Sequence, residues 1–169
     1  MRLRIFAINF KEIFTTMINA KADYRTRGVR NNNPFNIKNS LNHWKGKKAF
    51  SEKKDKTFEE FYNISFGLRA GVLLLRNYIN EGYNTVDKII SRFAPPVENF
   101  TSNYITYVES FVNTDGDVPF DGIISYGQES VEFYHLCYAI CLYESDYKLT
   151  PTTFRDLFKT FPELSNPNY

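Results

Sequence analysis

Cysteine, histidine and tryptophan are scarce in this sequence of 169 residues, which contains two cysteines, two histidines and one tryptophan. Cys137 and Cys141 lie four apart in an apolar stretch, so on a helix they share a face in a geometry that does not favour a disulfide. We expect two buried free thiols, because cysteine packs like a small hydrophobic residue. His135 is badly placed to complete a metal site with them. The sequence therefore predicts neither a metal site nor a cofactor.

An excess of one charge sign and long apolar runs are also lacking. The chain has 21 basic and 19 acidic residues and a net charge of +2, so no nucleic-acid partner is expected. The apolar run at residues 5–10 is too short for a membrane span and does not predict a conventional signal peptide. Basic residues nevertheless concentrate between positions 25 and 56. This region is either a surface for an anionic polymer or a solvated face.

Apolar and aromatic residues are plentiful, at 43% and 17% of the chain, which predicts a folded single domain. Hydrophobic periodicity predicts helices over residues 65–79, 86–94, 103–112 and 130 to about 147, with caps at Ser65, at Thr85 and at either Thr101 or Ser102. A short helix follows residue 151, and residues 3–22 are a weaker helix candidate. Two short strands at 35–37 and 58–61 flank the basic loop. The expected fold is α+β but mostly α, with a small antiparallel sheet.

Three consecutive asparagines precede Pro34 in the stretch RNNNPFNIK, residues 30–38. Asparagine side chains bond nearby backbone groups and tolerate left-handed conformations, so they can build a rigid irregular turn. Amides also pair with the hydroxyl and acetamido groups of sugars. A structural turn and a sugar-binding turn both remain open.

Several segments resemble known families. NNPFNIK, HWKG and FEEFYNISFGLRAGVLLL are similar to bacterial cell-wall glucosaminidases. More closely, RGVRNNNPFNIK, FGLRAG and RFAPPVENFTSNYITYV resemble a family of phage and prophage proteins with RG-R-NNNP-NI and R-APP-EN-T-YI signatures. Some of its members are regarded as virion structural proteins and others as lysozyme-like. The resemblance runs from Arg27 to about Val112 and implies a virion-associated protein whose partner is bacterial peptidoglycan.

One departure from the glucosaminidase pattern concerns the catalytic glutamate, which in those enzymes precedes the NNLFGIK-like strand. Here only Glu12 and Asp23 lie upstream, in no comparable motif. Instead YAICLYESDY, residues 138–147, resembles the A-I…E-S signature of lytic transglycosylases and goose-type lysozymes. This resemblance implies a circularly permuted lysozyme-like domain with Glu144 as catalytic acid. The alternative is an ordinary acidic residue near a helix end.

The presence of a second catalytic carboxylate would distinguish a hydrolase from a lytic transglycosylase. A two-carboxylate hydrolase needs a partner for the acid, whereas a lytic transglycosylase does not. Glu98 is the candidate partner, although it could equally be a residue at a helix entry. Four other acidic residues near the basic loop are expected to be solvated: Glu52, Asp55, Glu59 and Glu60. The candidate substrate contacts are amides, aromatic rings and a hydroxyl: Asn33, Asn36, Trp44, Tyr104, Ser145 and Tyr147.

Together these features predict a peptidoglycan-degrading enzyme of a phage virion, of lytic transglycosylase or muramidase type, that cleaves the β-1,4 glycan strand in the host cell wall. The alternative is a non-catalytic virion structural or wall-binding protein that retains the fold. Residues 1–24 form an N-terminal extension, 25–160 the lysozyme-like domain and 161–169 a tail. The extension either docks onto other virion proteins or adds a core helix.

Overall fold

The computed structural model describes residues 25–95, 101–113 and 121–166. Its helices are α2 (Arg27–Arg30), α3 (Ile64–Asn80), α4 (Val86–Phe93), α5 (Thr101–Val112), α6 (Val131–Ser145), α7 (Pro151–Thr160) and the 3-10 helix η1 (Pro162–Ser165). The prediction of a mostly helical protein is confirmed. The candidate helix at residues 3–22, and the N-terminal extension as a whole, lie outside the described residues.

Polar side chains fix where the longer helices begin. The side chain of Thr85 accepts a backbone N–H bond from the first turn of α4, as predicted, and that of Ser130 does the same for α6. Thr101 and Ser102, the predicted alternatives for the cap of the third helix, instead lie within α5. For α3 the cap is Asn63 rather than the predicted Ser65, and it accepts from the N–H of Phe66. The Ser65 hydroxyl instead donates to the Asn63 side chain.

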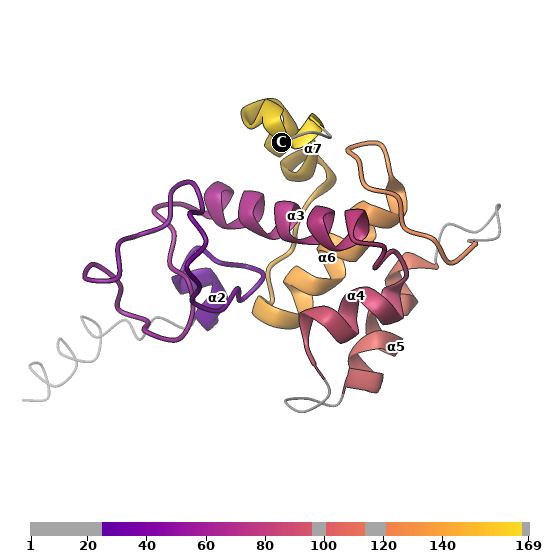
Figure 1. Cartoon of the computed structure of the whole chain (residues 1–169), viewed down its shortest axis with the longest axis horizontal. Helices are drawn as coiled ribbons and strands as arrows, with labels where there is room; N and C mark the ends of the chain where they lie inside the picture. The colour runs from indigo at the N-terminus through magenta and orange to yellow at the C-terminus, as the bar shows by residue number, and fades with distance from the viewer. Residues whose placement is uncertain (1–24, 96–100, 114–120, 167–169) are drawn as a thin grey trace, which may run out of the picture.

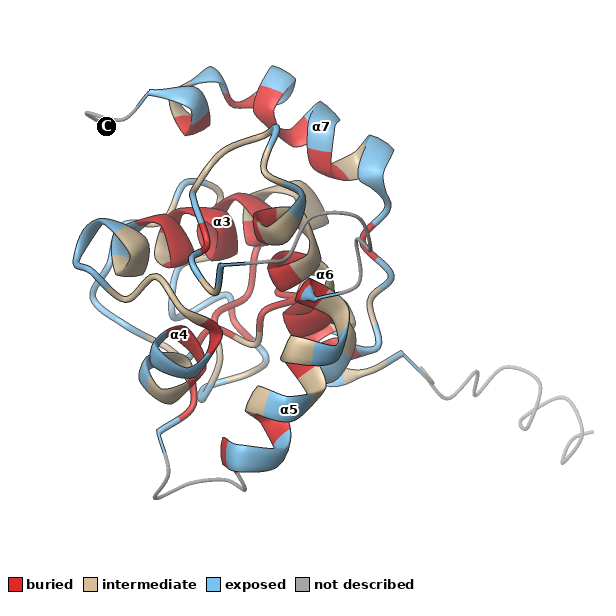
Figure 2. Cartoon of the chain, turned by 90° about the vertical axis from the view of Figure 1, so that its right-hand side faces the viewer, coloured by how far each residue is buried: buried red, intermediate tan, exposed pale blue. Residues whose placement is uncertain are grey.

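Figure 1 shows α3 crossing the middle of the molecule, with α6 behind it and α7 along one side. Helices α4 and α5 lie near one end of α3, while α2 and the irregular segment 31–63 lie near the other. Buried residues concentrate on α3 and α6 (Figure 2). Elements from the beginning and from the later part of the described chain therefore share one core. Helix α2 packs against the end of α6.

The core is built mainly from the apolar faces of α3 and α6. Leu68 and Leu75 of α3 and Phe133, Leu136 and Ile140 of α6 are each at most 1% exposed. Burying a side chain of this size contributes about 1.5–3 kcal/mol. The two cysteines of α6 are buried and free, as predicted, and burial raises the pKa of both thiols.

The predicted antiparallel sheet is not confirmed. In the irregular segment the only β-type pairings among the described residues are two isolated antiparallel bridges, Lys38 with Phe58 and Lys47 with Phe61. Asn36 has a φ of 47°, which interrupts any extended run between Phe35 and Lys38. Side-chain hydrogen bonds, described below, hold this region together in place of a ladder.

The C-terminal segment is part of the packed structure up to Asn166. Leu164 of η1 is fully buried, and Arg69 of α3 donates to Glu163 at 2.8 Å. The hydroxyl of Tyr126 donates to the carbonyl of Leu164 at 2.6 Å. Residues 161–166, which the sequence assigns to a tail, thus close one side of α3.

Within the described ranges, every helix is too short or too polar to span a membrane.

Candidate active site

Helix α6 carries Glu144 at its C-terminal end. The helix is apolar along most of its length and stops because Asp146 adopts a left-handed conformation, with a φ of 51°. The N–H groups of Asp146 and Tyr147 bond back to the carbonyls of Leu142 and Cys141. A carboxylate at a helix C-terminus faces the negative end of the helix dipole, so this position favours the protonated form of Glu144.

Burial has the same effect on Glu144. The side chain is partly buried, and loss of solvation raises its pKa above the ordinary glutamate value. Polar contacts from Asn36 and Tyr104 act in the opposite direction but do not cancel the effect of burial. A carboxyl with a raised pKa holds a proton closer to neutral pH, as a general acid requires.

Asn36 connects the irregular segment to this helix end. Its Nδ2 donates to the backbone carbonyl of Glu144 at 2.8 Å and to Oε2 of Glu144 at 3.3 Å. The left-handed backbone of Asn36 points the amide at α6, a conformation that asparagine tolerates better than most residues. The two residues are 108 positions apart, so the fold creates this contact.

Tyr104 of α5 borders Glu144 from the opposite side. Its ring is 1% exposed and stacks on Tyr143, with centroids 3.8 Å apart and planes at 12°. Its hydroxyl lies near the Glu144 carboxyl without meeting the geometry of a hydrogen bond. Burial, followed by the neighbouring Glu144, raises the pKa of Tyr104 far above its ordinary value.

Three buried polar atoms around Glu144 make no hydrogen bond within the described structure: Oδ1 of Asn36, the hydroxyl of Tyr104 and Oγ of Ser145. Buried polar atoms almost always have a partner, so a group of three at one place requires an explanation. All three atoms are themselves buried, and Oγ of Ser145 lies against Gly28 of α2.

Helix α2 supports the end of α6. The Thr26 hydroxyl donates to the carbonyl of Ser145. Gly28 lies so close that a Cβ there would stand 1.8 Å from Oγ of Ser145 and 2.8 Å from the carbonyl oxygen of Asn33. Only glycine fits between these two groups. This contact could not be predicted from the sequence, apart from the Arg-Gly pair that begins the resembling motif.

The three consecutive asparagines have structural roles in this fold. Asn31 donates to the carboxylate of Asp55 at 2.8 Å, and Asn32 donates to the carbonyl of Phe61 at 3.0 Å. Asn33 donates to the carbonyls of Ile37 and Glu59 and accepts from the N–H of Ile37. Asn33 is fully buried with its amide engaged by the protein. It is therefore not placed to meet a sugar, and Asn36 is the amide that reaches the candidate site.

The other predicted contact residues differ in their proximity to Glu144. Ser145 is adjacent to Glu144 but 1% exposed, and Tyr147 is half-buried just after the helix end. Trp44 is half-buried against the core. Glu98 lies outside the described residues. The structure thus brings Asn36 and Tyr104 to Glu144, whereas Ser145 is its neighbour in the chain and its Oγ lies against Gly28.

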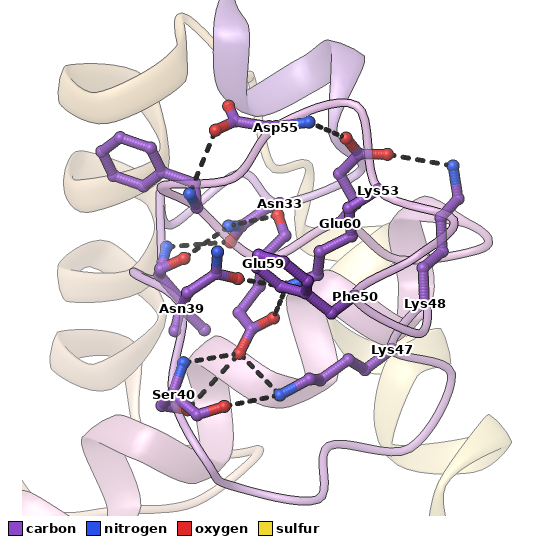
Figure 3. Close-up of polar contacts among 12 residues, drawn as sticks. Asn33, Asn39, Ser40, Lys47, Lys48, Phe50, Lys53, Asp55, Glu59 and Glu60 are labelled. Atoms are coloured by element: carbon purple, nitrogen blue, oxygen red, sulfur yellow. Dashed lines mark hydrogen bonds and ion pairs between the residues drawn. The ribbon is translucent and has the colours of Figure 1, made fainter.

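Of the four acidic residues expected to be solvated, Glu52 is exposed, but Glu59 and Glu60 are not. Glu59 is fully buried and Glu60 is 4% exposed. Figure 3 shows Glu59 between Lys53, Lys47 and Ser40, with Lys47 at 2.9 Å. Burial alone would raise the pKa of Glu59, but the lysine ammonium groups outweigh it and hold the pKa below its ordinary value. These carboxylates neutralise lysines inside the segment and are not catalytic candidates.

Asp55 has a similar role at the surface of this segment. It accepts two bonds from the Arg27 guanidinium, at 2.6 and 2.8 Å, and further bonds from Asn31 and two backbone N–H groups. The Arg27 bonds are the main reason that the pKa of Asp55 lies well below its ordinary value. In the described ranges, no group of His, Cys, Asp and Glu side chains could hold a metal ion.

Comparison with known proteins finds no matching family model. It does find a relative: the chain is 43% identical over 100 residues to Protein P5 of Pseudoalteromonas phage PM2. This chain is similar to a phage protein. The match covers 57% of the chain and 59% of Protein P5, so the chain spans less than two thirds of the relative's length. The predicted relationship to phage proteins is supported, and the lysozyme-like relationship stays a prediction.

Proposed function

We propose that this protein is a virion-associated phage enzyme that cleaves the glycan strands of bacterial peptidoglycan, with Glu144 as the general acid. The observation that carries the proposal is the setting of Glu144 at the end of a buried apolar helix, where burial raises its pKa. The amide of Asn36, which bonds to the Glu144 carboxyl, is a group that can pair with sugar hydroxyls. Similarity to a phage protein supports the biological setting.

The chemistry proposed for Glu144 is that of a single-acid lytic transglycosylase. The protonated carboxyl donates its proton to the glycosidic oxygen as the C1–O bond breaks. The C6 hydroxyl of the same sugar then attacks C1, and its proton passes to the Glu144 carboxylate. The products are a shortened strand and a 1,6-anhydro sugar, and Glu144 is protonated again. Among the described residues, Asn36 and Tyr104 orient the carboxyl, and neither can replace it as the acid.

The test is clearance of purified peptidoglycan sacculi by the full chain and by Glu144→Gln, which keeps the shape of the side chain and removes the acid. Loss of general-acid catalysis is expected to slow clearance about 10²–10⁴-fold. Glu81→Gln is the matched control, because Glu81 is exposed and pairs only loosely with Arg92, at 3.8 Å. Equal clearance by wild type and Glu144→Gln would remove Glu144 from the mechanism.

A non-catalytic wall-binding role is the second candidate. The contact that favours it is the bond from Asn36 to both the carbonyl and the carboxyl of Glu144, because it ties the irregular segment to α6 as a structural link would. A wild-type protein that sediments with sacculi but releases nothing would support this role and contradict the enzyme.

A further inference from the structure

A pocket of about 490 Å³ opens between α2 and the irregular segment, away from the Glu144 site. Its lining is dominated by cationic side chains: Arg25, Arg27, Arg30, Lys48, Lys54 and Lys56. Only two carboxylates, Asp55 and Glu60, line it with them. A concave surface with this imbalance focuses a positive potential on whatever enters it.

The two carboxylates are already committed to two of the cations. Asp55 holds Arg27 through two bonds, and Glu60 accepts from Lys48 at 3.1 Å (Figure 3 shows the latter pair). The pKa of each carboxyl lies below its ordinary value, so both are ionised at neutral pH and both pairs persist. The remaining cations therefore determine the charge of the pocket.

Two of those remaining cations bond to neutral carbonyl groups. The Arg30 guanidinium donates to the carbonyl of Arg25 at 2.5 Å, and the Lys56 ammonium donates to the carbonyl of Phe50 at 2.7 Å. In the part of the chain that the structure describes, no carboxylate lies within ion-pair distance of Arg30, Lys54 or Lys56. Their positive charges are available to a ligand, and the ligand they would bind is an anion with several acceptor oxygens.

The position of the pocket relative to Glu144 indicates which anion. Helix α2 forms one wall of the pocket with Arg27 and Arg30, and the same short helix packs on the end of α6 through Gly28. Peptidoglycan presents a glycan strand that carries peptides ending in free carboxylates. A strand whose sugars lie at Glu144 would bring these carboxylates close to α2.

We propose that this pocket binds the free carboxylates of peptidoglycan stem peptides and so holds the strand while the glycan occupies the site at Glu144. This inference rests on the proposed function. It assigns to Arg30 and Lys54 the recognition of the peptide part of the substrate, separate from the chemistry at Glu144.

The test measures binding of a soluble disaccharide–tetrapeptide, prepared from peptidoglycan, to the full chain by calorimetry. The double variant Arg30→Gln/Lys54→Gln is expected to weaken binding about tenfold or more, because two charge-assisted contacts are lost. Amidating the peptide carboxylates should weaken binding to wild type by a similar factor, and added salt should do the same. Both substituted side chains are exposed, so folding is expected to be unchanged.

Lys88→Gln/Lys159→Gln is the matched control, since it removes the same charge from exposed positions elsewhere. Unchanged peptide affinity in Arg30→Gln/Lys54→Gln would overturn the inference. So would a variant that loses affinity for a short DNA duplex but not for the peptide, because the pocket would then bind phosphates of nucleic acid.

The binding measurement does not depend on catalysis, so the two proposals can fail separately. Loss of peptide affinity in the double variant, with no sacculus clearance by wild type, would support the pocket and contradict the enzyme. Sacculus clearance by wild type, with peptide affinity unchanged in the double variant, would support the enzyme and contradict the pocket.

Discussion

At the scale of single residues, Glu144 differs from the other buried carboxyls because no cation neutralises it in the described structure. Glu59 is paired with two lysines, and these pairs hold its pKa below the ordinary value. Glu144 instead has an amide and a phenol beside it, and burial raises its pKa. The pKa is thus lowered for Glu59 and raised for Glu144, and of these two carboxyls only Glu144 suits proton donation.

The first prediction concerns the pH dependence of stability. Because the folded-state pKa of Glu144 lies above its unfolded value, Glu144 contributes stability below the unfolded pKa and loses that contribution as pH rises through the folded pKa. Glu144→Gln cannot ionise. Urea unfolding across pH should show the variant gaining stability relative to wild type as pH rises through this window. A constant difference between the two at all pH values would contradict the raised pKa.

The second prediction concerns Asn36. Its amide bond to the carboxyl lowers the pKa of Glu144, so removing the amide should raise that pKa further. Asn36→Gly is the suitable variant, because glycine tolerates the φ of 47°. The pKa of Glu144 can be followed by NMR titration. Asn32→Gly, at a φ of 53° and bonded to Phe61 instead, is the control and should leave the Glu144 pKa unchanged.

Residue roles could be predicted from the sequence only where they depend on local chemistry. The tolerance of asparagine for left-handed backbone anticipated Asn32 within the three consecutive asparagines, whereas Asn36 was predicted to be extended. It could not show that Asn33 would turn inward and Asn36 toward α6, because the partners of Asn36 lie more than a hundred residues away. The expectation that Glu59 would be solvated was wrong because Lys47 and Lys53 reach its carboxylate only after the segment folds.

At the scale of elements, the contact between α2 and the end of α6 positions the candidate site. The third prediction is that Gly28→Ala destabilises the protein by about 1–3 kcal/mol, since a Cβ would overlap Ser145 and the backbone of Asn33. Thermal unfolding measures the change. Gly82→Ala is the comparison, because a Cβ there meets nothing within 4 Å and only the φ of 89° opposes it. An equal or smaller loss for Gly28→Ala would contradict the close contact.

The fourth prediction concerns the irregular segment, which polar bonds stabilise in place of a sheet. Glu59→Gln leaves Lys53 buried without a counter-charge, and removing one partner of a buried ion pair costs about 3–5 kcal/mol. The pKa of Glu59 is lowered in the folded state, so wild-type stability should fall as pH drops through that pKa and the variant should lack this dependence. Glu52→Gln, at an exposed position, should change stability much less.

Several helices were predictable from the sequence because apolar residues recur at helical spacing behind a capping side chain, as in α4 behind Thr85. The four-residue α2 has no side-chain cap and shows no such pattern. The two strands were not confirmed, because alternation over three or four residues does not determine a ladder. In Phe35–Lys38 the left-handed Asn36 breaks the extended backbone, and the bonds from Asn33 satisfy the carbonyls of Ile37 and Glu59.

At the scale of the whole molecule, we propose that two regions serve two parts of one polymer. The carboxyl of Glu144 and the amide of Asn36 would meet the glycan, and the cations of the pocket beside α2 would meet the peptide carboxylates. The small net charge of +2 conceals this division, because the acidic residues lie mainly in the later half of the chain. Composition alone therefore could not reveal the pocket, although the concentration of basic residues between 25 and 56 marked its region.

The most direct measurement of the central claim is the mass of the soluble products released from purified peptidoglycan by wild type and by Glu144→Gln. The account predicts 1,6-anhydro-muropeptides from wild type, each lighter by one water than the hydrolysis product, and none from the variant. Anhydro products at equal rates from both proteins would contradict the assignment of Glu144 as the acid. Reducing-end products from wild type would contradict the single-acid mechanism and direct attention to Glu98 as a second carboxylate.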